Sequence, residues 1–200
     1  MEIDYLDPNT NIDDFVIPLN INYSQEIFQN IFYKYYNKEV KSNYTSYDAC
    51  SELKEYFTDF FKNQWPLSKH VMLGWYSPKS RPNKNSVPIH IDYDVASIVI
   101  PILGCTKECL TNIFLPVNEL NLNNSNRAIL PQGEFKHIAS FAFTNQICLL
   151  NTGMCHNIWK TSTTDTIRYL WRCESNLSWN DAKRIILEAN NSTNEFPPNI

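Results

Sequence analysis

The chain has 200 residues, of which 43% are hydrophobic and 14% aromatic, enough to bury one sizeable core and to exclude a disordered chain. Its net charge of −4 comes without a basic stripe. Nucleic acid is therefore not expected as a partner, although a small basic groove formed only in the fold would escape this argument. No stretch approaches the roughly 20 apolar residues of a membrane span, and the acidic N-terminus does not resemble a signal peptide. A cytoplasmic location without membrane contact is expected.

The first third of the chain, residues 1–66, is predicted to form an arm and two bracing helices. Residues 1–22 mix Asp, Asn and Pro with short apolar runs and are expected to wrap the fold as an irregular arm. After Ser24, apolar residues recur at helical spacing, and a second such pattern covers about 48–64 and ends before Pro66. The aromatic stripe on each helix indicates packing against a sheet.

From residue 71 onward, short β-rich runs follow one another between turn residues. The predicted strands are 71–76, 89–103, 112–117, 128–130, 138–143, 147–150, 156–160 and 166–173. The run 89–103 is too long for one average strand, so a bend or bulge is expected near 94–96. Short strands with no helix between them predict an antiparallel sandwich or barrel of about eight strands over 71–173. A closing helix is predicted over 178–190, opened by a capping box at Ser178.

The cysteines are interpreted as reduced thiols, because the chain is long and carries no export signal. They are Cys50, Cys105, Cys109, Cys148, Cys155 and Cys173. Cys105 and Cys109 could form half of a zinc site, but no second close pair of Cys or His follows in the sequence. Buried free thiols are the favoured interpretation.

Three side chains suit a single metal ion. Alternate residues of a strand face the same side, so His90 and Asp92 would project together. His156 follows the tight turn 151–154, which would present it at the mouth of a barrel. Two histidines and one carboxylate on one side of a metal leave positions open on Fe(II). Asp94 shares the face of Asp92 and stays an alternative ligand if the strand bends.

An arginine in the last predicted strand suggests an anionic ligand. Arg168 is flanked by apolar residues, and a buried arginine without an anion is costly. A dicarboxylate co-substrate would supply that anion, because a guanidinium can bind a carboxylate through two parallel hydrogen bonds. A structural salt bridge is the alternative role. Arg172 lies on the same face and is the rival candidate.

Pairing geometry favours Arg168 over Arg172. If the last two β runs form a hairpin, Arg168 pairs near Ile158, deeper in the barrel than His156. Arg172 then pairs near Met154, outward of the metal. The far carboxylate of a chelated co-substrate points inward, toward Arg168.

A His-x-Asp pair is weak evidence alone, but its combination with a distant His and a following Arg resembles the Fe(II)/2-oxoglutarate-dependent oxygenase superfamily. The resemblance covers 71–173 and is closest to small hydroxylase-like members with a helical N-terminal brace. It implies a single domain over 1–200 with a double-stranded β-helix (jelly-roll, cupin-like) core and flanking helices. By this resemblance His90, Asp92 and His156 would be the catalytic iron ligands.

The resemblance also implies how the co-substrate is held. Arg168 would bind the distal carboxylate of 2-oxoglutarate, and Tyr76, Thr111 and Asn112 are candidates for secondary contacts. The sequence departs from the family pattern at Leu170, two residues after Arg168, where some members carry Ser or Thr.

The implied reaction uses Fe(II), 2-oxoglutarate and O₂, with ascorbate as an optional stimulant, to hydroxylate a small molecule or an amino-acid or peptidyl side chain. Two alternatives stay open: a cupin-type metalloenzyme that does not use 2-oxoglutarate, and a metal-free binding module on a β scaffold. Loops 77–88 and 118–127 are expected to border the entrance. Trp75, Tyr93 and Trp159 either line the pocket or pack in the core, and His70 and His137 are expected to be accessory.

Overall fold

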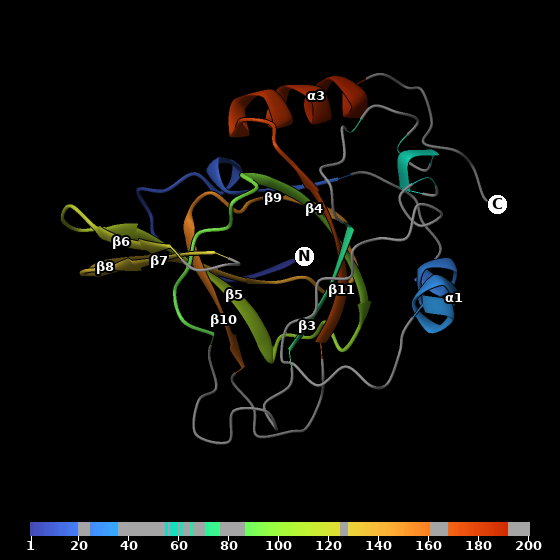
Figure 1. Cartoon of the computed structure of the whole chain (residues 1–200), viewed down its shortest axis with the longest axis horizontal. Helices are drawn as coiled ribbons and strands as arrows, with labels where there is room; N and C mark the ends of the chain where they lie inside the picture. Colours follow the sequence, from blue (N-terminus) through green and yellow to red (C-terminus); the bar gives the residue numbers. More distant parts are fainter. Residues whose placement is uncertain are drawn as a thin grey trace.

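The computed structural model describes residues 1–19, 25–35, 55, 57–59, 61, 65, 71–76, 87–124, 128–160 and 168–191. Within these ranges the chain is mainly antiparallel β with few helices (Figure 1). In chain order, the elements are β1 (Glu2–Leu6), η1 (Ile12–Asp14), β2 (Val16–Pro18), α1 (Gln25–Tyr35), β3 (Val71–Tyr76), β4 (Ala96–Leu103), β5 (Cys109–Pro116), β6 (Asn121–Asn124), β7 (Ile129–Gln132), β8 (Phe135–Ala142), β9 (Cys148–Asn151), β10 (Cys155–Lys160), β11 (Arg168–Ser175) and α3 (Trp179–Asn191).

Two larger sheets pack face to face. The smaller of these two sheets has four strands in the order β1-β8-β5-β10, and the larger has five in the order β2-β9-β4-β11-β3. A third, separate sheet consists of β6 and β7. Buried apolar residues from both larger sheets meet in one cluster, among them Val99, Ile113, Ala139, Phe141 and Leu170. This arrangement is that of a β-sandwich, and it confirms the predicted antiparallel β class.

Helices cover the outer face of the larger sheet. In Figure 1, α1 lies beside the sheet that contains β4 and β11, on the side away from β5 and β10. Phe28 and Phe32 of α1 and Ala182 of α3 share a buried cluster with Trp171 of β11. Both α1 and α3 therefore pack against the larger sheet. Most of the second predicted helix, about 48–64, lies outside the described residues.

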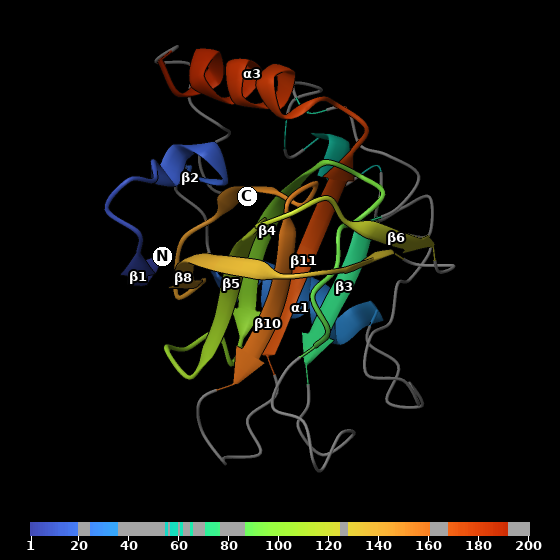
Figure 2. The same ribbon diagram turned by 90° about the vertical axis from the view of Figure 1, so that its left-hand side faces the viewer.

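The closing helix α3 begins where the sequence predicted. The backbone N–H of Asp181 donates to Oγ of Ser178 at 3.2 Å, which caps the first turn. Figure 2 shows α3 lying across one end of the strands. In the described part of the chain, no helix combines the length and apolar character that crossing a membrane requires.

The N-terminal arm is not irregular as predicted. β1 pairs with β8 and β2 pairs with β9, so each larger sheet gains an edge strand from the first 18 residues. The predicted turn region 118–127 likewise contains β6, which pairs with β7. In each case an available partner strand, rather than the local sequence pattern, supplies the backbone hydrogen bonds.

The long run 89–103 divides as expected. His90 and Ile91 make single bridges to other strands, residues 93–95 bend, and β4 then begins at Ala96. This bend separates the predicted metal-binding pair from the regular strand that follows.

The last two strands do not form the hairpin on which the choice between Arg168 and Arg172 was argued. β10 pairs with β5 in the smaller sheet, whereas β11 pairs with β3 and β4 in the larger one. The other edge of β10 receives backbone hydrogen bonds from Val87 and His90. Because both edges of each strand are occupied, β10 and β11 face each other across the sandwich instead of pairing.

Candidate metal centre

Backbone pairing brings two predicted ligands side by side. The N–H of His90 donates to the carbonyl of His156, and the N–H of His156 donates to the carbonyl of His90, both at 2.9 Å. The centroids of the two rings are 4.2 Å apart. Both side chains are buried, with 8% and 4% of His90 and His156 exposed.

The same local hydrogen bond orients both imidazoles. Nδ1 of His90 lies 2.9 Å from the carbonyl of Pro88, and Nδ1 of His156 lies 2.8 Å from the carbonyl of Met154. A carbonyl oxygen only accepts, so each Nδ1 carries the proton and donates it. Each Nε2 therefore keeps its lone pair, and this is the tautomer that binds a metal through Nε2.

Asp92 completes the group. Its Oδ1 lies 3.6 Å from Nε2 of His90, and its Oδ2 lies 3.7 Å from Nε2 of His156. Ligand atoms of these three residues all lie within 4.8 Å of one another. Asp94 does not belong to this group, so the bend selects Asp92 as the nearby carboxylate. Two imidazole nitrogens and one carboxylate oxygen could hold a divalent metal ion.

The protonation states suit metal binding. Burial lowers the pKa of His156 to about 4, helped by the neighbouring His90, so this imidazole is neutral near pH 7. Burial disfavours the ionised form of Asp92, but Arg172 and the two histidines outweigh it and hold the pKa of Asp92 below its ordinary value. A neutral imidazole and an ionised carboxylate are the forms that coordinate metals.

Arg172 binds the carboxylate of this group. Its Nη2 donates to Oδ2 of Asp92 and also to Oε1 of Glu174 at 2.8 Å. Arg172 and Glu174 are both buried. Burial raises the pKa of Glu174 to about 7, against the opposing effect of Arg172. From the sequence, Arg172 was only the rival candidate to Arg168, and no role in the site was predicted for Glu174.

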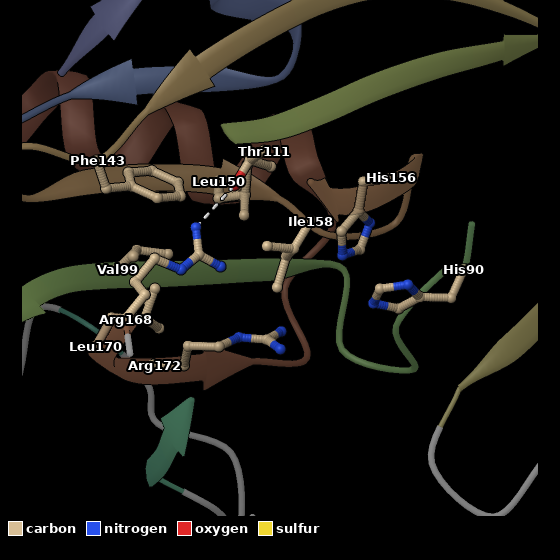
Figure 3. A pocket seen from close by; sticks show the side chains of 10 residues that line it. All are labelled: His90, Val99, Thr111, Phe143, Leu150, His156, Ile158, Arg168, Leu170 and Arg172. Carbon is tan, nitrogen blue, oxygen red and sulfur yellow. Dashed lines mark hydrogen bonds between the residues drawn. The ribbon is translucent and has the colours of Figure 1, made fainter. Parts of the chain in front are cut away.

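A cavity between the sheets joins the histidines to both arginines. Its lining is His90, Val99, Thr111, Phe143, Leu150, His156, Ile158, Arg168, Leu170 and Arg172. Figure 3 shows Arg172 extending toward the two histidines and Arg168 reaching toward Thr111. The apolar side chains form much of the remaining wall.

Arg168 is a buried cation in this cavity. Only 5% of it is exposed, and its Nη1 donates to Oγ1 of Thr111 at 3.3 Å. Across the described ranges, no carboxylate forms an ion pair with Arg168. Thr111 stands opposite Ile158 in the β5–β10 ladder, so Arg168 does lie near the level of Ile158, although across the sandwich rather than within a hairpin.

Of the other two predicted co-substrate contacts, Asn112 faces away from the cavity and Tyr76 stays a prediction. Asn112 follows Thr111 in β5 and faces the opposite side, because successive residues of a strand alternate. Its amide donates to Asn157 at 2.8 Å and accepts from Ser140 at 2.6 Å, so it does not line the cavity. The backbone of Tyr76 is paired with Arg168, but its side chain lies outside the described part.

The remaining predictions concern the accessory histidines and three aromatic residues near the site. His137 bonds with Ser140 and stacks on Tyr5, away from the cavity. Tyr93 and Trp159 are half-exposed and so belong to no core. His70 and the side chain of Trp75 lie outside the described residues.

The cysteines do not form a metal site in the part of the chain that the structure describes. Five are free thiols: Cys105, Cys109, Cys148, Cys155 and Cys173. None belongs to a cluster of possible metal ligands there. Cys50 lies outside the described residues.

Comparison with protein-family models and with curated proteins found no match to this chain. Among solved structures, it matches a chain of hydroquinone 1,2-dioxygenase PnpCD, solved with Cd²⁺ and 4-hydroxybenzonitrile, at 12% sequence identity and a TM-score of 0.33. The match covers 73% of this chain and 98% of that one. A likeness this weak shows neither family nor activity, so the function must be argued from the site itself.

Proposed function

We propose that this chain is an Fe(II)- and 2-oxoglutarate-dependent oxygenase that hydroxylates a small molecule or an amino-acid side chain. The observation that carries the proposal is Arg168, a buried cation in the cavity of the candidate metal centre with no carboxylate partner among the described residues. Arg172, by contrast, is already balanced by Asp92 and Glu174. A buried guanidinium is favourable only with a counter-charge.

An anionic co-substrate that spans the cavity would meet this need. A divalent ion held by His90, Asp92 and His156 adds positive charge to the same space, which favours an anion further. 2-Oxoglutarate has a keto-acid end that chelates a metal and a second carboxylate suited to the guanidinium of Arg168. The hydroxyl of Thr111 already fixes the orientation of that guanidinium.

Iron fits the donor set. Two histidines and one carboxylate that leave open positions are typical of non-haem Fe(II) oxygenases. Bound there, Fe(II) would supply the redox chemistry with O₂. One oxygen atom would enter succinate as 2-oxoglutarate loses CO₂, and the other would enter the substrate as a hydroxyl group. The protein would orient the co-substrate and exclude water with Val99, Leu150 and their apolar neighbours.

The strand order supports a double-stranded β-helix as the finer fold class. Segment 87–91 bonds to β10 and so extends the smaller sheet beyond its named strands. With that segment counted, the chain alternates between sheets from β3 to β5 and again from β8 to β11. On this proposal β1, β2 and the β6–β7 hairpin are additions to an eight-stranded jelly-roll, cupin-like core.

The test titrates 2-oxoglutarate into the anaerobic Fe(II)-loaded protein. Binding is monitored by the visible charge-transfer absorption band of the Fe(II) chelate. Admission of O₂ should then give succinate. Arg168→Met should weaken 2-oxoglutarate binding by about 100-fold or more while Fe(II) affinity is retained. Arg184→Met is the control, because Arg184 is exposed on α3 and does not line the cavity.

The other outcomes separate the alternatives. Metal binding without a charge-transfer band or succinate would favour a cupin-type enzyme that does not use 2-oxoglutarate. Failure to bind any divalent metal would favour the metal-free binding module. Equal 2-oxoglutarate affinity in Arg168→Met and the wild type would refute the role of Arg168.

A further inference from the structure

The two oxygens of Asp92 have different surroundings. Oδ1 lies 3.6 Å from Nε2 of His90, and Oδ2 lies 3.7 Å from Nε2 of His156. Only Oδ2 also accepts a hydrogen bond from Nη2 of Arg172. The same Nη2 lies 2.8 Å from Oε1 of Glu174. One amino group of the guanidinium therefore bridges two carboxylates: that of Glu174, which is buried, and that of Asp92, whose side chain is 11% exposed and belongs to the candidate metal centre.

We propose that Arg172, fixed by Glu174, is a positioning residue that occupies one oxygen of Asp92 and leaves the other as a single ligand for the metal. This inference rests on the metal ligands of the proposed function but does not depend on 2-oxoglutarate being the co-substrate.

The number of ligand atoms decides how many metal positions stay open. A carboxylate can bind a metal through one oxygen or through both. In an octahedral complex, two histidines and one carboxylate oxygen leave three positions, and a carboxylate that uses both oxygens leaves two. A chelating co-substrate and O₂ together need three. The proposed reaction therefore requires Asp92 to be held to one oxygen.

The bridge suits this task because it is buried and anchored. Arg172 is 6% exposed and Glu174 is 5% exposed, so water and salt screen their attraction weakly. Both residues lie two apart in β11 and project from the same face of the strand. Glu174 thus limits the freedom of a long side chain and keeps its Nη2 directed at Asp92.

A stabilising ion pair alone would predict a different behaviour. If Arg172 served only to neutralise buried charge, its loss would lower the melting temperature and leave the metal coordination unchanged. If it positions Asp92, its loss would leave Oδ2, which already lies 3.7 Å from Nε2 of His156, without the hydrogen bond from Arg172 and able to bind the metal as well. Counting metal-bound water separates the two roles.

The experiment loads the 200-residue chain with Mn(II), without co-substrate, and counts exchangeable metal-bound waters by water-proton relaxation. The wild type should keep the waters of an octahedral ion with three protein ligand atoms. Arg172→Met should show one water fewer, and Arg172→Lys, which keeps a charged donor, should restore it. Arg168→Met is the matched control from the same strand and cavity, and it should not change the count.

Each outcome bears on the inference. A wild type that already lacks one water would show that Asp92 uses both oxygens and would overturn it, even if Arg172→Met does not fold. An unchanged count in a folded, Mn(II)-binding Arg172→Met would also overturn it, while leaving the proposed function intact. A wild type that binds no Mn(II) or Fe(II) would overturn the ligand assignment and the proposed function together.

Discussion

His90 and His156 exchange both of their backbone hydrogen bonds, at 2.9 Å each, although they lie far apart in the sequence. Two residues of the candidate metal centre are therefore direct partners in one antiparallel β-bridge. Their separation is set by the backbone, and the orientation of each ring is set by a carbonyl two residues earlier. The site is preorganised before any ion binds, because none of these hydrogen bonds depends on a metal.

The first prediction follows from this backbone bridge. His156→Ala should lower Fe(II) or Mn(II) affinity by about 100-fold or more, because one of three ligands is lost. The bridge uses main-chain atoms, so the substituted protein should keep its native circular-dichroism spectrum. Calorimetric titration measures the affinity, and His137→Ala, outside the cavity, is the control. Undiminished affinity in His156→Ala would contradict the ligand assignment.

The second prediction concerns the acid sensitivity of the metal-free protein. The folded pKa of His156 is about 4 and its ordinary value is 6.5, so between these values the unfolded state binds a proton that the folded state does not. His156 therefore destabilises the fold as pH falls through this window, by about 3 kcal/mol in total. His156→Gln should remove this dependence of the free energy of unfolding on pH. Urea unfolding of both proteins from pH 7 to pH 4 measures it, and parallel curves would contradict the lowered pKa.

The third prediction concerns Glu174, whose effect on stability depends on pH in the opposite direction to that of His156. The folded pKa of Glu174 is about 7 against an ordinary value of 4.5, so the folded state holds a proton that the unfolded state has lost. Glu174 therefore destabilises the fold as pH rises from about 4.5 to 7, again by about 3 kcal/mol. Glu174→Gln should gain stability relative to the wild type over this range. In the wild type, the pH dependence of the free energy of unfolding that Glu174 causes is opposite in sign to that of His156, and the two nearly cancel. Each contribution is therefore seen only as a difference in stability between the variant and the wild type.

A Glu174→Gln protein whose stability relative to the wild type does not change with pH would contradict this explanation. Asp181→Asn is a suitable control, because Asp181 is an exposed carboxylate on α3 whose pKa is lowered by Ser178 rather than raised.

The sequence predicted the parts of the site that depend on local chemistry. Histidine and aspartate two residues apart suggest convergence in any extended segment, and the bend after Asp92 followed from a run too long for one strand. The structure brings His90, Asp92 and His156 together as expected. Their contact is thus anticipated by residue types and spacing, with no knowledge of which strands pair.

The remaining features depend on contacts between distant segments. The sequence 109–116 has no clear alternation, so it could not show that Thr111 faces the cavity while Asn112 faces away. The contact of Arg172 with Asp92 requires β11 to lie opposite the bend, which no local pattern encodes. One signal for Glu174 was available: it shares a strand face with Arg168 and Arg172, and a buried acidic residue there would need a cation.

The last prediction tests which of two neighbouring residues serves the cavity. Thr111→Val keeps the side-chain shape but removes the oxygen that orients Arg168, so 2-oxoglutarate affinity should fall by about 3- to 10-fold. Asn112→Ala should leave that affinity unchanged and instead reduce the free energy of unfolding by about 1–3 kcal/mol, because Asn157 and Ser140 lose a buried partner. Equilibrium titration and urea unfolding of both variants measure these effects. If Asn112→Ala weakens 2-oxoglutarate binding more than Thr111→Val does, the original prediction for Asn112 is right and the face assigned to it here is wrong.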